Sequence, residues 1–193
     1  EGIRGAEWYN NGPDFTTTAP KHNTIIPFTR NVVGSMDYTP VTFTNSQFPH
    51  LTSYGHELAQ SVVYESGIQH MADRPSGYYE LPDAARSFLK EVTSSWDDTK
   101  LVSGYPGKDI IIARRKSDNW FIGGMNSEDK EKTLTFNLPF LENGVKYKLT
   151  LIADGEHDKD FAIDYSVIDN SGSVKVKVLR RGGFAAILKP VKD

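Results

Sequence analysis

The sequence predicts an α+β fold in which a part made of loops and helices precedes an antiparallel β-sandwich. Two observations carry this prediction. Before about residue 98, apolar residues recur at three- and four-residue spacing, whereas after it they alternate with polar residues or form short runs. Combinations of Gly, Asn, Asp and Pro also divide the second part into short, evenly spaced segments. We therefore expect the architecture to change near residue 98.

Two helices and one short strand are expected in the first part. Apolar residues at helical spacing predict a helix over residues 54–72 and a second over residues 81–92, with Pro82 in its first turn. Residues 33–41 are predicted to form a short strand that ends in polar groups, with Pro40 turning the chain away. His56 and Glu57 would lie on the first helix, but adjacent helical residues point apart and do not form a pair.

Eight strands are expected in the second part. The predicted ranges are 101–103, 109–115, 120–125, 132–138, 146–153, 162–168, 174–179 and 184–188. Lys175 and Lys177 alternate with three valines, which predicts one solvated and one buried face for that strand. Short strands at this spacing are typical of an antiparallel sandwich. This part contains no catalytic constellation.

Composition narrows the possible partners. The 193 residues carry a net charge of −3, and the basic residues are scattered, so neither nucleic acid nor an anionic membrane is an expected partner. No run approaches the roughly 18 apolar residues of a membrane-spanning helix. The absence of cysteine excludes disulfides and thiolate zinc sites, and it fits a cytosolic protein or a large periplasmic one.

The first eleven residues are the richest in functional groups. Glu1, Arg4, Glu7, Trp8 and Tyr9 combine carboxylates, a guanidinium group and aromatic rings. A carboxylic acid can protonate a glycosidic oxygen, and flat rings accept the apolar faces of sugars. Such a segment at residue 1, without Met or a leader, suggests that the chain starts partway through a larger protein. On composition alone, solvated surface charges are the plainer interpretation, because glutamate is mostly exposed in proteins.

Glu1 and Glu7 have two possible roles by residue chemistry. In extended backbone, positions i and i+6 project from the same face, so the two carboxylates can converge. Converging carboxylates can share a hard cation such as Ca2+, or they can serve as a general acid and its neighbour. The sequence lacks a phosphate-binding glycine loop, a His-x-x-x-His metal pair and a Gly-x-Ser-x-Gly elbow.

Several motifs resemble glycoside hydrolase family 97, which contains the α-glucosidases and α-galactosidases of Bacteroidetes. They are residues 1–7 (Glu-Gly-Ile-Arg-Gly-Ala-Glu), residues 26–40, residues 56–66 and residues 120–124 (Trp-Phe-Ile-Gly-Gly). The resemblance covers essentially the whole chain, and its most specific motif lies at 26–40. One departure is Ser35, where family members often have proline; this changes local stiffness without affecting the acid assignment.

The resemblance implies a fold and a site. Residues 1–98 would be the C-terminal part of a (β/α)8 catalytic barrel, and residues 99–193 a C-terminal β-domain. Glu7 resembles the family's general acid, and Glu1 and Glu7 both resemble ligands of its active-site calcium ion (Ca2+). The remaining ligands, and the base or nucleophile, lie upstream in the family. The expected partners are an oligosaccharide substrate and the remainder of the same enzyme, in a periplasmic or secreted bacterial location.

Four residues are candidates for substrate contacts: Arg4, Trp8, Asp37 and Tyr38. Asp37 and Tyr38 fall at the carboxyl end of the predicted strand, where barrel strands present functional side chains. A turn-forming aspartate before a proline explains the same residues equally well.

The expected function is that of a fragment of an α-glycoside hydrolase, with inversion or retention left open because the second carboxylate lies upstream. Two alternatives remain for the second part. One is a carbohydrate-binding module that uses Trp120, Phe121 and Tyr147, although alternation would bury about half of them. The other is a structural β-domain that shields the barrel. Trp96 is expected to pack between the two parts.

Overall fold

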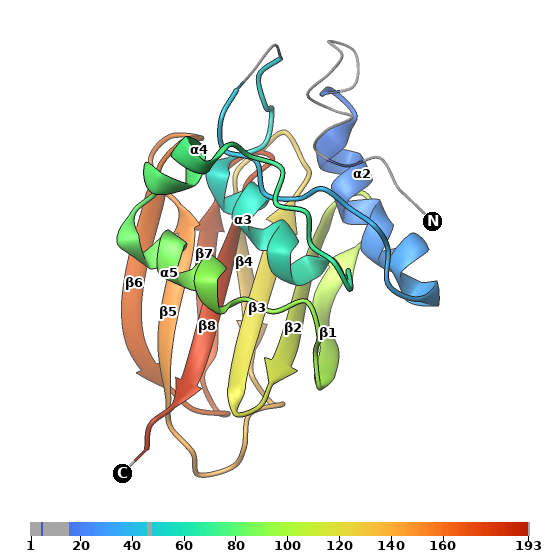
Figure 1. The fold of residues 1–193 in the computed structure, drawn as a ribbon. Helices are drawn as coiled ribbons and strands as arrows, with labels where there is room; N and C mark the ends of the chain where they lie inside the picture. Colours follow the sequence, from blue (N-terminus) through green and yellow to red (C-terminus); the bar gives the residue numbers. More distant parts are fainter. Residues whose placement is uncertain (1–4, 6–15, 46–47, 193) are drawn as a thin grey trace.

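A six-stranded antiparallel sheet forms the centre of the fold, with helices on one face and a two-stranded antiparallel sheet on the other (Figure 1). The structure is a computed structural model that describes residues 5, 16–45 and 48–192. The strand order of the larger sheet is β1-β2-β3-β8-β5-β6, and β4 pairs with β7 in the smaller one. None of the described helices is long and apolar enough to cross a membrane.

All eight predicted strands are present, and their ends lie within three residues of the predicted ones. They are β1 (Asp98–Tyr105), β2 (Asp109–Lys116), β3 (Asn119–Asn126), β4 (Lys132–Asn137), β5 (Tyr147–Asp154), β6 (Phe161–Ile168), β7 (Ser173–Val178) and β8 (Gly183–Pro190). The predicted antiparallel sandwich is thus confirmed. The alternation predicted for β7 is also confirmed, because its three valines are buried and Lys175 and Lys177 are exposed.

The helical part is more broken than predicted. Its elements are α2 (Ala19–Ile25), the 3-10 helices η1 (Ile26–Phe28) and η2 (Arg30–Val33), and the helices α3 (Tyr54–Val63), α4 (Pro75–Tyr79) and α5 (Asp83–Glu91). The prediction over 81–92 agrees with α5. The prediction of a helix over 54–72 was wrong in its length, because α3 ends at Val63. The predicted strand at 33–41 shrinks to bridge residues at Asp37 and Tyr38, of which Tyr38 pairs in parallel with Gln69.

The early end of α3 has a tertiary cause. Arg114 on β2 is buried, and its guanidinium donates to the carbonyl oxygens of Val62 at 2.6 Å and Val63 at 3.1 Å. These carbonyls belong to the last turn of α3, where no further turn of helix would satisfy them. Glu65 lies 3.4 Å from the same guanidinium. A strand residue that is distant in sequence therefore supplies the hydrogen bonds for the last carbonyl oxygens of this helix.

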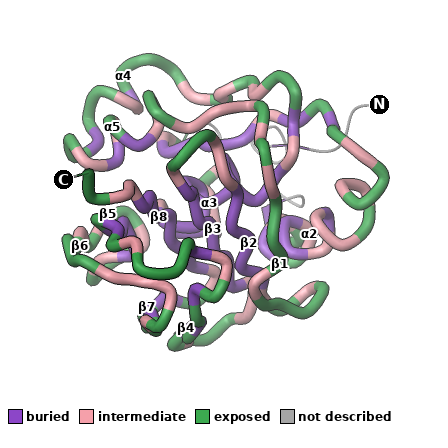
Figure 2. Tube along the Cα trace, turned by 90° about the horizontal axis from the view of Figure 1, so that it is seen from below, coloured by how far each residue is buried: buried purple, intermediate pink, exposed green. Residues whose placement is uncertain are grey.

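Hydrophobic clusters lie on both faces of the large sheet, one between the two sheets and two on the helical side. Between the two sheets, Leu134 and Phe136 of β4 meet residues such as Phe184 of β8. On the other face, Leu58 and Val62 of α3 belong to a cluster with α5 and the sheet. Strands β3 and β8 are therefore buried on both faces, which explains their continuous apolar runs. Figure 2 shows the buried residues concentrated along these strands and α3.

The two predicted parts share one of these clusters. Phe121, Ile152 and Ile187 of the sheet lie in the same cluster as the helices. Trp96 packs as predicted, with its ring centroid 5.3 Å from that of Phe121. The boundary at residue 98 therefore marks a change of secondary structure across a continuous core, and the division into domains 1–98 and 99–193 stays a prediction. Among the described residues, the parallel pairing that a barrel requires is limited to the Tyr38–Gln69 bridge.

Candidate functional site

The predicted acid and calcium ligands lie outside the described residues. This applies to Glu1, Arg4, Glu7 and Trp8, whose roles stay predictions. Gly5 is described and buried. A Cβ added to Gly5 would lie 2.8 Å from the backbone nitrogen of Thr39 and closer still to its hydroxyl oxygen, so only glycine fits there. Gly5 therefore packs directly against the segment that carries the other two candidate residues.

Asp37 is an accessible carboxylate beside this contact. Its side chain is 66% exposed, and its Oδ1 lies 3.8 Å from Nε2 of His70. That distance is too long for a hydrogen bond, so the pair is a loose ion pair whenever the imidazole is protonated. The carboxylate is accessible to a ligand, and its predicted contact with substrate stays a prediction.

Tyr38 lies in the core. It is 2% exposed, its ring centroid is 4.5 Å from that of Tyr64, and its hydroxyl donates to Oδ1 of Asn23 at 3.2 Å. This side chain therefore fixes the orientation of Asn23. Its predicted role as a substrate contact stays a prediction.

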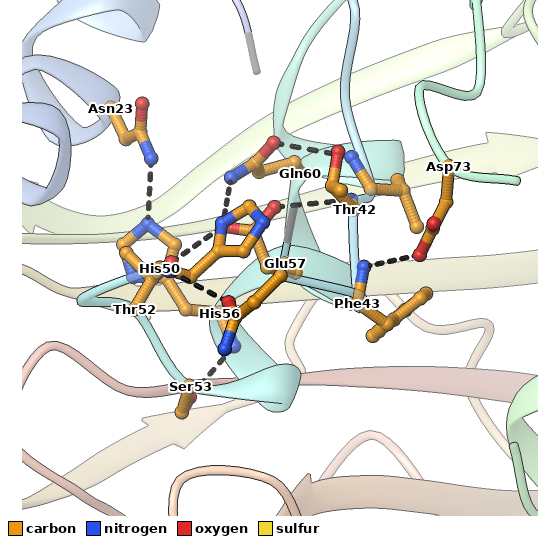
Figure 3. A network of polar contacts seen from close by, with 12 residues as sticks. Asn23, Thr42, Phe43, His50, Thr52, Ser53, His56, Glu57, Gln60 and Asp73 are labelled. Carbon is orange, nitrogen blue, oxygen red and sulfur yellow. Dashed lines mark hydrogen bonds and ion pairs between the residues drawn. The ribbon is translucent and has the colours of Figure 1, made fainter. Parts of the chain in front are cut away.

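Through Asn23, the hydrogen bond from Tyr38 connects to a buried histidine on α3. Because Oδ1 of Asn23 accepts from Tyr38, its amide nitrogen is the donor to Nε2 of His56, at 3.1 Å (Figure 3). Nε2 is then the acceptor, and Nδ1 carries the proton. Burial lowers the pKa of His56, while the negative charge of Glu57 and, less strongly, nearby backbone groups oppose that shift, so the ring is neutral near pH 7. The sequence gives no signal for this chain of contacts, because its members are far apart.

Glu57, the next residue on α3, belongs to a separate buried network (Figure 3). Its carboxylate accepts from Oγ1 of Thr52 at 2.6 Å, from Nε2 of Gln60 at 3.1 Å and from the backbone nitrogen of Thr42 at 3.3 Å. Nδ1 of His50 lies 3.8 Å away. His56 and Glu57 thus point apart, as predicted, and Glu57 ties the segments before α3 to the helix.

A carboxylate that the sequence analysis did not single out joins α3 to the sheet. Asp154 ends β5 and accepts from the Ser53 hydroxyl, from the backbone nitrogen of Leu179 at 2.8 Å and from that of Gly183 at 2.9 Å. Ser53 also caps α3, accepting from the backbone nitrogen of His56 at 3.1 Å. Burial raises the pKa of Asp154 to about 6, although these hydrogen bonds lower it.

The described residues do not by themselves make a calcium site. No group of three or more His, Cys, Asp or Glu residues in the described part of the chain could hold a metal ion. A hard cation such as Ca2+ takes roughly 6–8 oxygen ligands. Calcium binding by Glu1 and Glu7, which lie outside the described residues, stays a prediction.

Comparison with known proteins decides the family. The family described as "Glycosyl-hydrolase 97 C-terminal, oligomerisation" matches residues 95–189. The "Probable retaining alpha-galactosidase" of Streptomyces bingchenggensis is 37% identical over 177 residues, which are 92% of this chain and 27% of that protein. The chain belongs to glycoside hydrolase family 97. The "Retaining alpha-galactosidase" of Bacteroides thetaiotaomicron is 31% identical over 206 residues, covering 98% of this family 97 chain and 30% of the relative.

Solved family 97 structures share the fold. A family 97 enzyme from Pseudoalteromonas sp. strain K8, in complex with acarbose, superposes with a TM-score of 0.85 at 28% identity. The superposition covers 98% of this chain and 31% of that one. A β-arabinopyranosidase with a TM-score of 0.83 and 23% identity shows likeness of fold alone. The family 97 chain thus spans about 27–31% of the length of these relatives.

Proposed function

We propose that the chain is the C-terminal part of a retaining α-galactosidase that removes terminal α-linked sugars. The observation that carries this proposal is the 37% identity, over 92% of the chain, with a relative described as a probable retaining α-galactosidase. The family also includes a solved enzyme with acarbose bound, at 28% identity. An α-glucosidase is therefore the alternative to test.

The barrel proposed for residues 1–98 has partial support in the backbone. Tyr38 and Gln69 form a parallel bridge, and α3 lies between them in the chain. A strand, a helix and a parallel strand in succession are the repeating unit of a (β/α)8 barrel. Gly5 packs against Thr39, which is consistent with a further barrel segment at that position. The preceding part of the same protein would complete the barrel.

The catalytic proposal places the acid role on Glu7. Glu7 protonates the glycosidic oxygen as the bond to the leaving group breaks, while a carboxylate from the upstream part attacks the sugar carbon. In a retaining enzyme, these two groups lie roughly 5–5.5 Å apart. Arg4, Trp8 and Asp37 are the candidates for holding the sugar, and the buried Tyr38 would act indirectly by positioning Asn23. Glu1 and Glu7 would bind a calcium ion, which supplies a fixed positive charge for positioning sugar hydroxyls. A periplasmic or secreted location is part of the same proposal.

The substrate is tested on the full-length enzyme. We expect faster turnover of p-nitrophenyl α-galactoside than of the α-glucoside, with α-galactose as the first product in an NMR time course. Preference for the glucoside would favour the alternative substrate, and β-galactose as first product would contradict retention. The chain of residues 1–193 alone is expected to be inactive, because it lacks the second carboxylate. Turnover by this chain would contradict the proposed division of the site.

The acid role is tested by Glu7→Gln in the full-length enzyme. Loss of the proton donor should lower kcat by about 10²–10⁴-fold for substrates with poor leaving groups, and much less for good ones, which leave without protonation. Glu142→Gln is the control, because Glu142 is an exposed turn residue between β4 and β5. An equal decrease in kcat for substrates with poor and with good leaving groups would show that Glu7 is not the general acid.

The second candidate function concerns residues 95–189, for which self-association is favoured over sugar binding. The matching family is described as an oligomerisation region. The aromatic residues of the alternative carbohydrate-binding interpretation, Trp120, Phe121 and Tyr147, are all buried, at 4%, 2% and 4% exposure. The prediction that alternation leaves about half of them accessible was wrong, since both faces of β3 are covered. The molecular mass of the full-length enzyme in solution tests self-association.

A further inference from the structure

The two outer strands of the large sheet differ in how their open edges are protected (Figure 1). An edge strand carries unpaired backbone groups, and proteins usually protect such edges with charged side chains, especially lysines, or with prolines or bulges. At one edge, β1 has Lys100 and a bulge between Leu101 and Ser103. At the other, β6 pairs with β5 without any irregularity from Phe161 to Ile168 and contains no Lys, Gly or Pro. The β6 edge is therefore open to another strand.

Strand β6 also carries two exposed apolar side chains on its regular, unbulged edge. Tyr165 is 68% exposed and Val167 is 60% exposed. Both share a face with Phe161 and Ile163, which pack against the core beneath the helices. Among the described residues, β6 makes ladder hydrogen bonds with β5, and its outward-facing backbone groups have no other strand beside them. An apolar pair on an open strand edge is a typical docking surface for another strand.

We propose that β6 of a second copy of this chain pairs antiparallel with β6 across a two-fold axis, joining the two large sheets. This inference rests on the proposed self-association of residues 95–189, and it names the surface. A two-fold interface uses the same patch on both copies, so the patch must be complementary to itself. Strand β6 meets this requirement, because its pairing with β5 is regular, most of its residues are exposed, and Asp164 is its single charged residue.

The charge on β6 selects the register. In an antiparallel pair, residues directly opposite each other have side chains on the same face of the sheet. With a two-fold axis perpendicular to the sheet, one residue must therefore lie opposite the same residue of the second copy, and this residue marks the position of the axis. An axis at Asp164 would oppose two like carboxylates, and one at Ser166 would place Asp164 opposite an isoleucine. An axis at Tyr165 places the two tyrosines together, Ile163 opposite the second copy's Val167, and Asp164 opposite its Ser166. Of these three central positions, Tyr165 is therefore the favoured one for the axis.

Another exposed apolar surface is better explained by the rest of the same protein. Val32, Val33 and Ile68 are 67–82% exposed. Their segments adjoin one another, since Nδ2 of Asn31 donates to the carbonyl oxygen of Glu65 at 2.9 Å. This surface lies next to the parallel Tyr38–Gln69 bridge, where the proposed barrel continues. The surface on which the second copy binds is therefore assigned to β6.

The test measures the mass of the full-length enzyme by light scattering coupled to gel filtration. We expect the wild type to be a dimer. Tyr165→Lys and Val167→Lys should each halve the measured mass, because each substitution would bury an unpaired ammonium group in the β6–β6 interface. Leu101→Lys is the matched control, since Leu101 is 60% exposed on the opposite edge, and it should remain a dimer. All three side chains are exposed, so folding should be unchanged by circular dichroism.

A covalent test checks the register. Opposite residues in an antiparallel pair have Cα atoms roughly 4.5–5.5 Å apart, within the span of a disulfide. Tyr165→Cys should give a cross-linked dimer on a non-reducing gel, and Leu101→Cys should not. A wild-type dimer that persists in both lysine variants, or that fails to cross-link at Tyr165→Cys, would overturn the β6 interface while leaving self-association intact. A monomeric wild type would overturn self-association itself.

Discussion

At the scale of single residues, Asp154 is the group whose protonation the fold perturbs most clearly. It is 6% exposed, and its two oxygens serve the N-terminus of α3 and the segment between β7 and β8. Burial of the carboxyl group raises its pKa from 3.8 to about 6, so the folded chain holds this proton more tightly than the unfolded chain does. Its contribution to stability is therefore complete below about pH 4 and is lost as the pH rises through about 6.

We expect Asp154→Asn to remove this pH dependence, because the amide does not ionise. The free energy of unfolding lost by the variant, relative to wild type, should be larger at pH 4 than at pH 7, by up to about 3 kcal/mol. Urea unfolding of the purified chain at both pH values measures this difference. Asp118→Asn is the control, with a side chain that is 69% exposed. A deficit that grows with pH would contradict the argument.

At the scale of elements, α3 lies unusually close to the sheet because glycines line the contact. A Cβ on Gly123 of β3 would lie 2.8 Å from the carbonyl oxygen of Ala59. A Cβ on Gly183 of β8 would lie 2.8 Å from the Cα of His56. The backbone of α3 therefore contacts the backbone of β3 and β8 directly. This contact fixes the position of α3, and with it the positions of His56 and Glu57 in their separate hydrogen-bond networks.

Gly55→Ala should separate α3 from the sheet. The added Cβ would lie 2.9 Å from the carbonyl carbon of Gly183, and closer still to its oxygen and to Oδ1 of Asp154. We expect a loss of about 1–3 kcal/mol in the free energy of unfolding, measured by urea denaturation. Gly67→Ala is the matched control, because nothing lies within 4 Å of its added Cβ, and it should be neutral or slightly stabilising. Equal effects for the two variants would refute this account of the contact.

At the scale of the whole molecule, the large sheet depends on cover from both sides. The helices bury Phe121, Ile152 and Ile187 on one face, and the β4–β7 pair buries the other. The helical part thus completes the core of the β-domain, whatever its role in the proposed barrel.

A shortened chain of residues 95–193 should therefore expose this face. Removal of α3 and α5 would leave Phe121, Ile152 and Ile187 in contact with water, and exposed apolar patches of this kind promote association. We expect strong fluorescence of the dye ANS and aggregation on gel filtration, neither of which residues 1–193 should show to the same extent. A soluble shortened chain that unfolds cooperatively and does not bind the dye would be contrary evidence.

Much of the β-domain could be predicted from local pattern. The alternation of Val174, Val176 and Val178 with lysines predicts β7, because the solvated and buried faces of a strand alternate along the sequence itself. The family could also be predicted from local sequence, because its motifs are short and contiguous. The candidate site could be predicted only as residues: Glu1 and Glu7 follow from the resemblance, and their positions lie outside the described residues.

The sequence by itself determined the eight strands, the break near residue 98 and the family, since each of these depends on neighbouring residues. Only the tertiary structure decided that α3 stops at Val63, that Tyr38 turns into the core toward Asn23, and that the carboxyl group of Asp154 is buried. In each case the deciding partner is distant in sequence: Arg114 for α3, Asn23 for Tyr38, and Ser53 for Asp154. The free energy of burying a polar group depends on such partners, and no local pattern encodes them.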